Sequence, residues 1–434
     1  MTAPLVSPFV KLLPGDKIKN WAGNLEYSTD RLYAAESIEQ VADIVKKHSK
    51  IKVLGSRHCF NRIADSRDNF ISLKQLNKVL SIDTEKQTVT VEAGINYGQL
   101  CPYLEEKGYA LHNLASLPHI SIAGACTTAT HGSGVKNANL STAVRAIEFV
   151  TADGKTHTVE RGKDREQFNA IVVGLGGIGV ITKLTLAIQP SFTMRQDVFE
   201  RLPMAQLNNH FDAIVGAGYS VSLFTDWQSD TINEVWIKSK ISAEKFAYTD
   251  NFFGAKAATE NMHPIADLSA ENCTEQMGVP GSWYERLPHF KMGFTPSSGV
   301  ELQSEYFVPH KHAVEAIQAI AKLGKQVGPH LLISEIRTID ADDCWMSPCY
   351  QQASVTIHFT WKQDWPAVQK LLPVIEKALE PFHAKPHWGK LFTMSPAHLA
   401  SLYEKLPAFR QVLKQYDPTG KFKNDFLSTY IYGA

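Results

Sequence analysis

Val53-Leu54-Gly55-Ser56-Arg57-His58-Cys59-Phe60-Asn61 is the stretch of this chain from which its fold and chemistry can be worked out. A β-rich run ends in a turn that contains Gly55 and Ser56, so several backbone N–H groups can point into one concavity that suits a pyrophosphate. An anion-binding turn needs no imidazole, yet His58 stands inside this one. Either His58 carries a covalent bond to the cofactor whose phosphates the turn holds, or it is a loop histidine of no special consequence.

The charge balance and the termini of the sequence exclude several classes of protein. The 434 residues include 44 Lys and Arg against 44 Asp and Glu, and this neutrality argues against nucleic acid or an anionic membrane as the main partner. Residues 1–19 lack the uninterrupted apolar region of a secretory signal, and no run approaches transmembrane length. The six cysteines are scattered, which favours free thiols. We therefore expect a cytoplasmic protein.

The first part of the chain predicts an α+β arrangement. Ser37 and Gln40 form a capping box at the start of an amphipathic helix whose apolar face carries Val41, Ile44 and Val45. A further helix is expected over 97–107, where Gly108 provides the C-cap. Alternating or β-branched residues predict strands at 52–54, 88–94, 146–151, 156–159 and 180–188. These strands follow one another too closely for a simple βαβ alternation.

The second part of the chain predicts an inserted sheet. Strand-like runs occur at 220–224, 235–237, 304–307, 331–333 and 355–359, together with a helical stretch at 312–324. This pattern indicates a sheet with helices on one face. The last sixty or so residues are expected to be mainly helical.

Residues 174–179 read Gly-Leu-Gly-Gly-Ile-Gly and match the dinucleotide-binding pattern G-x-G-x-x-G. That pattern requires a following helix, whose N-terminus receives the pyrophosphate. Here the next residues, 180–186, are β-branched and alternating, which predicts a strand. The glycines are better explained by a sharp backbone turn beside a large flat ligand.

The segment 116–134 consists almost entirely of small residues from Ala123 onward. Little side chain then separates the backbone from its neighbours, which favours close approach to an extended cofactor. Tight packing between structural elements explains the same composition equally well. His119 and His131 within this segment are either polar contacts or satisfied loop residues.

A third group of polar residues lies far downstream. In a strand, Glu335 and Arg337 project from the same face, as do His358 and Thr360, and Lys390 can reach them from a loop. Such a cavity suits a polyhydroxylated substrate, because each hydroxyl requires a donor and an acceptor. The alternative is a surface ion pair beside a buried core histidine.

With these motifs, the sequence resembles the flavin-dependent alditol oxidases of the xylitol oxidase type, within the vanillyl-alcohol-oxidase-like family of FAD enzymes. The resemblance runs from end to end. Several motifs belong to the wider group of sugar and lactone oxidases, whereas Glu335 and Arg337 together with Ser116 point to alditols. Besides the segments above, it rests on residues 20–24, 220–227, 272–276, 387–390 and 417–422.

The resemblance implies a fold and a cofactor. We expect a two-subdomain FAD-binding domain at 1–190, to which about 380–434 return, and a cap domain at 191–379 with an antiparallel sheet covered by helices. His58 matches the residue that carries the flavin 8α-methyl bond. The family's second tether, a cysteine, is missing from 113–123, so a single link is expected. The other residues that match cofactor-contacting positions are Val53, Leu54, Gly55, Ser56, Arg57, Cys59, Ala115, Ser116, Ser121, Gly124, Thr128, Ala129, Thr130, His131, Ile178, Val180 and Ile181.

The resemblance also implies a reaction. A terminal primary hydroxyl of xylitol, sorbitol or a similar polyol would be oxidised to the aldose by hydride transfer to flavin N5, and oxygen would be reduced to hydrogen peroxide. A small residue, here Ala115, lies where oxygen must reach the flavin. The residues that match the polyol-binding set are Ser116, Glu335, Arg337, Thr360 and Lys390.

Arg337 and Lys390 are the expected cationic groups that stabilise developing negative charge. His358 has the most suitable intrinsic pKa for a proton acceptor, and Lys390 could serve if desolvation lowers its own pKa. Arg337, Lys390 and His358 are therefore the candidate catalytic residues.

Two other functions are compatible with parts of the sequence. A gulonolactone-type oxidase or dehydrogenase would share the fold and His58. A metal-dependent hydrolase could use His310 with His312 or His383 with His387, but no third ligand such as an H-E-x-x-H helix accompanies either pair. We expect no metal, no partner beyond a small polyol and oxygen, and a monomer.

Overall fold

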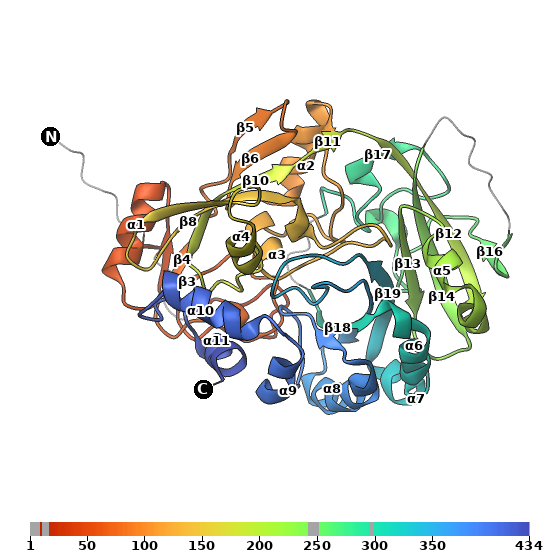
Figure 1. Cartoon of the computed structure of the whole chain (residues 1–434). Coiled ribbons are helices and arrows are strands. Elements are labelled where there is room, and N and C mark those ends of the chain that lie inside the picture. Colours follow the sequence, from red (N-terminus) through yellow and green to blue (C-terminus); the bar gives the residue numbers. More distant parts are fainter. Residues whose placement is uncertain (1–8, 11–16, 242–250, 295–298, 434) are drawn as a thin grey trace.

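The computed structural model describes residues 9–10, 17–241, 251–294 and 299–433. Residues 1–8 and 11–16, which belong to the expected cofactor domain, and residues 242–250, which belong to the expected cap, lie outside this description. The described chain forms two regions (Figure 1). Two small sheets and the helices of both ends of the chain lie on one side, and a large sheet lies on the other.

The N-terminal region contains a small mixed sheet that carries the His58 turn. Its order is β1-β2-β4-β3, and the neighbours β2, β4 and β3 are parallel. Helix α1 (Ile38–Lys47) precedes β3; the Ser37 hydroxyl caps it and Val41, Ile44 and Val45 are buried, as predicted. The four strands are Phe9–Val10 (β1), Leu32–Ala34 (β2), Lys52–Val53 (β3) and Phe70–Ser72 (β4).

A second, antiparallel sheet has the order β5-β6-β10-β8-β9. Helix α2 (Tyr97–Glu106) begins with a capping box of Asn96 and Gln99, and α3 (Ile122–Thr127) and α4 (Arg165–Ile171) follow. A short pair joins β7 (Tyr109–Ala110) to β11 (Gln189–Pro190). The five strands are Val79–Asp83 (β5), Thr88–Glu92 (β6), Val144–Val150 (β8), Thr156–Glu160 (β9) and Val180–Ala187 (β10).

The large sheet is antiparallel throughout, with the order β15-β16-β12-β14-β13-β19-β20-β18-β21 and β17 paired to β12. The sequence therefore predicted the inserted sheet correctly, although its strands are longer than the apolar runs that indicated them. The strands are Thr193–Pro203 (β12), Ser220–Thr225 (β13), Thr231–Lys240 (β14), Asn251–Phe252 (β15), Ala255–Ala257 (β16), Gly281–Ser282 (β17), Glu301–Pro309 (β18), Leu331–Ile339 (β19), Ser354–Lys362 (β20) and Lys385–Pro386 (β21).

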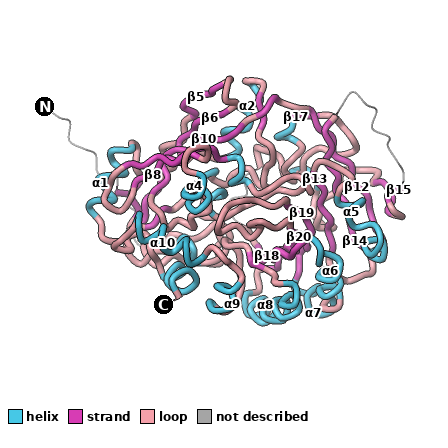
Figure 2. Tube along the Cα trace, in the orientation of Figure 1, coloured by secondary structure: helices cyan, strands magenta, loops and turns pink. Residues whose placement is uncertain are grey.

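Helices cover the outer face of this sheet (Figures 1 and 2). The outward residues of the central strands are largely apolar, and Tyr306 of β18 donates a hydrogen bond to Glu376 of α8. Because successive strand residues alternate between faces, Glu305, His358 and Glu335 point the other way, toward the N-terminal region. The covering helices are Leu207–Val215 (α5), Ala313–Ala321 (α6), Gly324–Val327 (α7) and Trp365–Leu379 (α8).

The C-terminal segment contacts the first sheet. The helices of this segment are Pro396–Ser401 (α9), Leu406–Tyr416 (α10) and Asp425–Leu427 (α11). Figure 1 shows α10 near β3 and α4, whereas α9 lies beside α8. The backbone N–H of Ile51 donates to Lys421, and the buried Lys52 ammonium donates to the carbonyl oxygen of Phe422. The fold class is α+β, as expected.

Candidate active site

The His58 turn follows β3 directly and is held by residues 20–24. The backbone N–H of Trp21 donates to the carbonyl oxygen of Arg57, and the side chains of Asn20 and Asn24 donate to the carbonyl oxygens of Cys59 and Phe60. Arg57 has φ +61°, a left-handed conformation that the turn imposes on a non-glycine residue. Residues 20–24 therefore fix the path of the backbone on both sides of His58.

The same turn contacts the small-residue segment through Ser121. The backbone N–H of Ser121 donates to Oγ of Ser56, and a Cβ added to Gly55 would lie 2.9 Å from Oγ of Ser121. Farther along, a Cβ on Gly132 would lie 2.4 Å from the carbonyl oxygen of Leu114. Tight packing within the chain thus accounts for part of the small-residue composition, and a close approach to a ligand is not needed at Gly132.

The half-buried His58 ring lies among other rings. Its centroid is 4.5 Å from the Trp21 ring and 5.1 Å from the His119 ring. Nδ1 of His58 is buried and has no hydrogen-bond partner among the described residues. Burial, together with the nearby His119 and Lys390, lowers the pKa of His58 to about 3, so the imidazole is neutral and a ring nitrogen keeps its lone pair.

Residues 174–179 lead directly into strand β10 and not into a helix, which excludes the dinucleotide-binding interpretation. Gly179 has φ +150°, and a Cβ there would lie 2.4 Å from the carbonyl oxygen of Val150. Ile178, Val180 and Ile181 are all buried. Val180 and Ile181 pair with Val150 and Phe149 of β8, so these residues belong to the packed interior beside that strand.

On the inner face of the large sheet, three adjacent strands place polar side chains in one row. Glu335 of β19 is directly opposite His358 of β20, which is directly opposite Glu305 of β18. Arg337 and Thr360 lie two positions along their strands and share this face. The alternation predicted from the sequence is therefore confirmed. The register of the strands also brings the pair Glu335 and Arg337 next to the pair His358 and Thr360.

Glu305 is the centre of this cluster. Its buried carboxylate accepts from Lys390 Nζ at 2.7 Å and from Arg337 at 3.1 Å, and His131 Nε2 lies 3.2 Å from Oε1. Lys390 also lies 2.8 Å from Nδ1 of His358, whose Nε2 is 3.0 Å from the Thr360 hydroxyl. The Arg337 and Lys390 cations and two imidazoles thus surround one carboxylate, and the Thr360 hydroxyl is linked to it through His358.

The charges stabilise one another in this buried site. Burial opposes ionisation of Glu305, but Lys390, His131 and Arg337 outweigh it and hold the pKa of Glu305 well below its ordinary value. Burial, partly offset by Glu305, lowers the pKa of Lys390. Burial and the neighbouring Lys390 lower the pKa of His358 to about 4. His358 is therefore a weak base here, whereas Lys390 is a stronger acid than an ordinary lysine.

The loop 387–390 joins the cluster to the His58 turn. Asn61 donates to the carbonyl oxygens of Trp388 and Lys390 at 2.8 and 2.7 Å, and the backbone N–H of Phe60 donates to Gly389. On its other side, the backbone N–H of His387 donates to the carbonyl oxygen of Glu305. The turn that contains His58 and the sheet that contains Glu305 are thus held together by one loop.

Not every predicted residue joins this cluster. Ser116 is half-buried, and within the described residues no hydrogen bond links it to Glu305, Glu335 or Arg337. The Thr128 hydroxyl forms hydrogen bonds within its own segment: it donates to the carbonyl oxygen of Gly124, and its oxygen lies 3.3 Å from that of the Thr130 hydroxyl. His131, expected among the cofactor contacts, does join the cluster through Glu305, and Ala129, two residues before it, adopts φ +54°.

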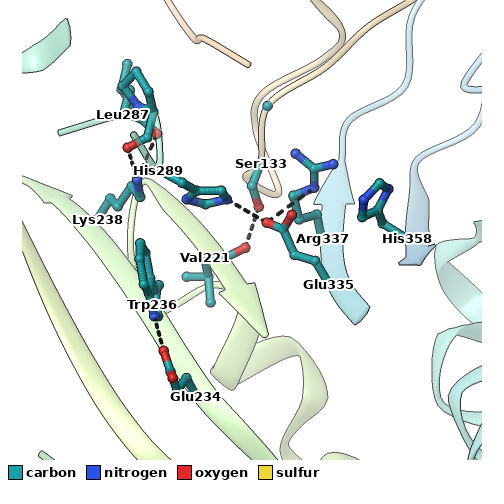
Figure 3. Close-up of polar contacts among 12 residues, drawn as sticks. Ser133, Val221, Glu234, Trp236, Lys238, Leu287, His289, Glu335, Arg337 and His358 are labelled. Carbon is teal, nitrogen blue, oxygen red and sulfur yellow. Dashed lines mark hydrogen bonds and ion pairs between the residues drawn. The ribbon is translucent and has the colours of Figure 1, made fainter. Parts of the chain in front are cut away.

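Sequence reasoning missed one residue of the cluster, Glu305, and two buried residues behind it. Glu305 lies within a run that was recognised only as strand-like, and its charge in the otherwise uncharged stretch 302–308 was the available signal. His289, whose Nε2 lies 2.8 Å from Oε1 of Glu335, comes from an irregular loop that has no periodicity. Lys238 is fully buried behind that loop (Figure 3).

The pairs considered for a metal site do not form one. No group of three or more His, Cys, Asp or Glu side chains that could hold a metal ion is found in the part of the chain that the structure describes. His310 instead bonds Asp212 at 2.7 Å. Likewise, no helix within the described ranges is both long and apolar enough to cross a bilayer.

Comparison with known proteins agrees with this geometry. Residues 29–160 match the family model of an FAD binding domain, and residues 297–430 match the model of D-arabinono-1,4-lactone oxidase. The crystal structure of cholesterol oxidase from B. sterolicum superimposes with a TM-score of 0.77 at 14% identity, covering 99% of this chain and 100% of that one. At this identity the likeness establishes the fold alone.

Two relatives cover almost the whole chain. L-gulonolactone oxidase from Bos taurus is 26% identical, over 96% of this chain and 99% of that protein. Alditol oxidase from a Streptomyces species is 42% identical, over 96% of this chain and 99% of that protein. The chain therefore belongs to the alditol oxidase family of FAD-dependent oxidases.

Proposed function

We propose that this protein oxidises the terminal primary hydroxyl of alditols such as xylitol and sorbitol. The alcohol carbon loses a hydride, its hydroxyl loses a proton, and oxygen takes up both as hydrogen peroxide. The observation that carries this proposal is the buried Glu305 cluster, in which two cations, an imidazole and a hydroxyl share one sheet face. Such a site offers both donors and acceptors to the hydroxyls of an open-chain sugar alcohol.

FAD is held through a covalent bond to His58. The buried and unpartnered Nδ1 of His58 supports this assignment, because it leaves a neutral ring nitrogen free to bond a group from outside the chain. The Gly55–Ser56 turn is suited to the diphosphate, and Ile178, Val180 and Ile181 to the adenine side. The remaining residues of the cofactor set are Val53, Leu54, Arg57, Cys59, Ala115, Ser116, Ser121, Gly124, Thr128, Ala129, Thr130 and His131.

Lys390 accepts the hydroxyl proton. A neutral lysine amine has two hydrogens, and its Nζ has two acceptors in the structure, Oε2 of Glu305 and Nδ1 of His358. The remaining lone pair is then available to the substrate, and the ammonium that forms is stabilised by Glu305. Bound FAD supplies the hydride acceptor.

The other members of the cluster bind and orient the polyol. Burial lowers the pKa of Arg337, but the carboxylates of Glu335 and Glu305 outweigh this effect and raise it. The guanidinium therefore stays charged and stabilises the developing alkoxide. Glu335 and Thr360 receive hydroxyls farther along the chain, and Ser116 contributes from the cofactor side. Ala115, a small residue, leaves room for oxygen.

The proposal extends to organisation and location. The cofactor domain comprises 1–190 with the return at about 380–434, and the cap comprises 191–379. The protein acts as a cytoplasmic monomer without nucleic acid or a membrane as partner. All six cysteines are free thiols, which supports a reducing compartment.

The deciding experiment compares xylitol, sorbitol and L-gulono-1,4-lactone as substrates of the purified yellow enzyme, with peroxide release and oxygen consumption as readouts. We expect peroxide in equal amount to oxygen with either alditol. Preferential oxidation of the lactone would assign the enzyme to the lactone oxidases instead, a second candidate favoured by the match of residues 297–430. Alditol oxidation only with an artificial electron acceptor would make it a dehydrogenase.

A further inference from the structure

Behind Glu335 lies a second layer of buried groups that the reaction itself does not use. The layer consists of His289, Lys238 and Thr274, and Figure 3 shows His289 directed at the Glu335 carboxylate from the side opposite to His358. All three side chains are buried. This layer lies where it can set the position of a substrate-binding carboxylate without touching the substrate.

His289 contacts only one of the two oxygens of Glu335. Nε2 of His289 lies 2.8 Å from Oε1, and Nε of Arg337 lies 3.5 Å from the same atom. No polar side chain of the described residues is within hydrogen-bond distance of Oε2. The contacts therefore orient the carboxylate with Oε1 toward the protein and leave Oε2 for a hydroxyl.

The His289 ring has little freedom to turn. Its edges meet Phe224 and Trp236 at centroid distances of 5.4 and 5.3 Å. Nδ1 of His289 is buried and has no hydrogen-bond partner, whereas Nε2 has the carboxylate. A neutral ring protonated at Nε2 therefore satisfies the contact, and burial favours this neutral form by lowering the pKa of His289.

Lys238 fixes the loop that carries His289. Its Nζ donates to three consecutive carbonyl oxygens, those of Arg286, Leu287 and Pro288, at 2.7, 2.9 and 2.7 Å. These three bonds use all three hydrogens of the ammonium. Because Lys238 is buried and all its N–H groups donate to consecutive carbonyl oxygens of the loop, its role is to hold the loop in position.

Thr274 also forms hydrogen bonds with this loop. Its hydroxyl donates to the carbonyl oxygen of Pro288 at 2.8 Å, and its backbone N–H donates to that of His289 at 2.9 Å. Gln196 of β12 in turn donates to the carbonyl oxygen of Thr274. Residues 272–276 have no part in the proposed chemistry. The hydrogen bonds of Thr274 indicate that this motif holds the loop that carries His289.

We propose that His289, held by Lys238 and Thr274, is a positioning residue that orients Glu335 toward the distal hydroxyls of the polyol and thereby sets the preference for alditols over simpler alcohols. This inference rests on the proposed function. It predicts an effect on the recognition of hydroxyls beyond the reacting carbon and little effect on the chemical step. A residue needed only for folding would not separate these two effects.

The test compares the variants His289→Leu and His289→Gln with xylitol and 1,2-propanediol as substrates. The diol has a reacting hydroxyl but lacks the distal ones. We expect His289→Leu to raise KM for xylitol by about tenfold, the equivalent of one lost hydrogen bond to a charged group, with kcat near wild type. Its kcat/KM for the diol should stay within about twofold of wild type, inside the usual scatter of such effects. Glutamine keeps an N–H donor, so His289→Gln should recover most of the xylitol KM.

Lys238→Met tests the layer behind His289. It removes the ammonium, keeps most of the side-chain volume, and should reproduce the xylitol KM increase together with a lower melting temperature. Lys421→Met is the matched control, because Lys421 is a buried lysine that donates to the carbonyl oxygen of Val45 far from the cluster. It should lower the melting temperature without changing the xylitol-to-diol ratio of kcat/KM.

The outcomes separate this inference from the function on which it rests. Wild-type enzyme that oxidises neither xylitol nor sorbitol contradicts the proposed function and this inference with it. Wild-type enzyme that is active on xylitol, combined with an unchanged substrate ratio in His289→Leu, contradicts the inference alone. An equal loss of kcat/KM on xylitol and on the diol, not recovered by glutamine, also overturns it.

Discussion

The Lys390 ammonium nitrogen lies 2.7 Å from Oε2 of Glu305, whose side chain is fully buried. Arg337 and His131 contact the other oxygen of the same carboxylate. Because a buried charge that loses its partner is costly, the two cations depend on Glu305 as much as it depends on them. The electrostatics of the site thus centre on a residue that was not among the sequence-derived candidates.

Glu305→Gln should therefore damage both stability and activity. Leaving Lys390 and Arg337 without their shared counter-charge should lower the free energy of unfolding by roughly 3–5 kcal/mol. Misplacement of the two cations should reduce kcat/KM for xylitol by about 100-fold. Denaturant unfolding and oxygen consumption measure the two effects. Glu376→Gln is the control, since Glu376 is buried on the outer face of the same sheet, where it should leave kcat/KM unchanged.

The pH dependence of kcat/KM should follow Lys390. Burial lowers the pKa of Lys390 below its ordinary 10.5, so its neutral, proton-accepting form becomes available at a lower pH than for an exposed lysine. We expect kcat/KM to rise with pH and then level off, with an apparent pKa below 10.5. Because the pKa of His358 is lowered to about 4, its titration should not change kcat/KM near pH 6.5.

Lys390→Arg provides the check on this assignment. A guanidinium keeps the positive charge but does not deprotonate in this range, so kcat/KM should be low and independent of pH. Near-normal activity of this variant with an unchanged pH profile would show that the proton goes elsewhere.

His58→Ala should abolish the covalent attachment of flavin. Wild-type protein is expected to retain flavin fluorescence on a denaturing gel under ultraviolet light, and the variant to lose it. Cys59→Ala is the matched control, because burial raises the pKa of the neighbouring Cys59 thiol to about 12 and keeps it from acting as the nucleophile. Fluorescence that persists in His58→Ala but disappears in Cys59→Ala would assign the link to the thiol.

Glu234 should make the protein less stable as pH rises. Burial raises the pKa of Glu234 to about 7, although Trp236 donates a hydrogen bond to it. The folded state then binds a proton that the unfolded state releases between about pH 4.5 and 7, and this stabilisation is lost as pH rises through that window. At pH 8, Glu234→Gln should be more stable than wild type by on the order of 3 kcal/mol, and the difference should shrink toward pH 4.5. Thermal unfolding at both pH values tests this, with exposed Glu85→Gln as the control.

Strand periodicity was sufficient to place the polar pairs on one face. Glu335 with Arg337 and His358 with Thr360 follow the period of two, and the structure confirms both pairs. The period does not reveal which strands are neighbours or in what register they pair. The contact between Glu305 and Lys390 joins residues 85 positions apart, so it depends on a register that no local pattern specifies.

Irregular segments were harder to interpret than strands. His289 lies in a loop whose shape is set by Lys238 and Thr274, both distant in sequence, and no turn motif marks it. His131 matches a cofactor-contacting position in the resemblance, and its local sequence did not indicate the contact that its ring makes with Glu305 of the large sheet. Side-chain direction in such segments is decided by tertiary packing and not by local propensity.

The hydrogen bonds from Phe60 and Asn61 to residues 388–390 also bear on when the enzyme can mature. The ribosome makes the His58 turn early, whereas the loop that secures it emerges only near the end of translation. A nascent chain therefore contains His58 before it contains the loop 387–390 that holds the turn in place. The flavin attachment proposed for His58 can therefore take place in its final surroundings only after synthesis has passed Lys390.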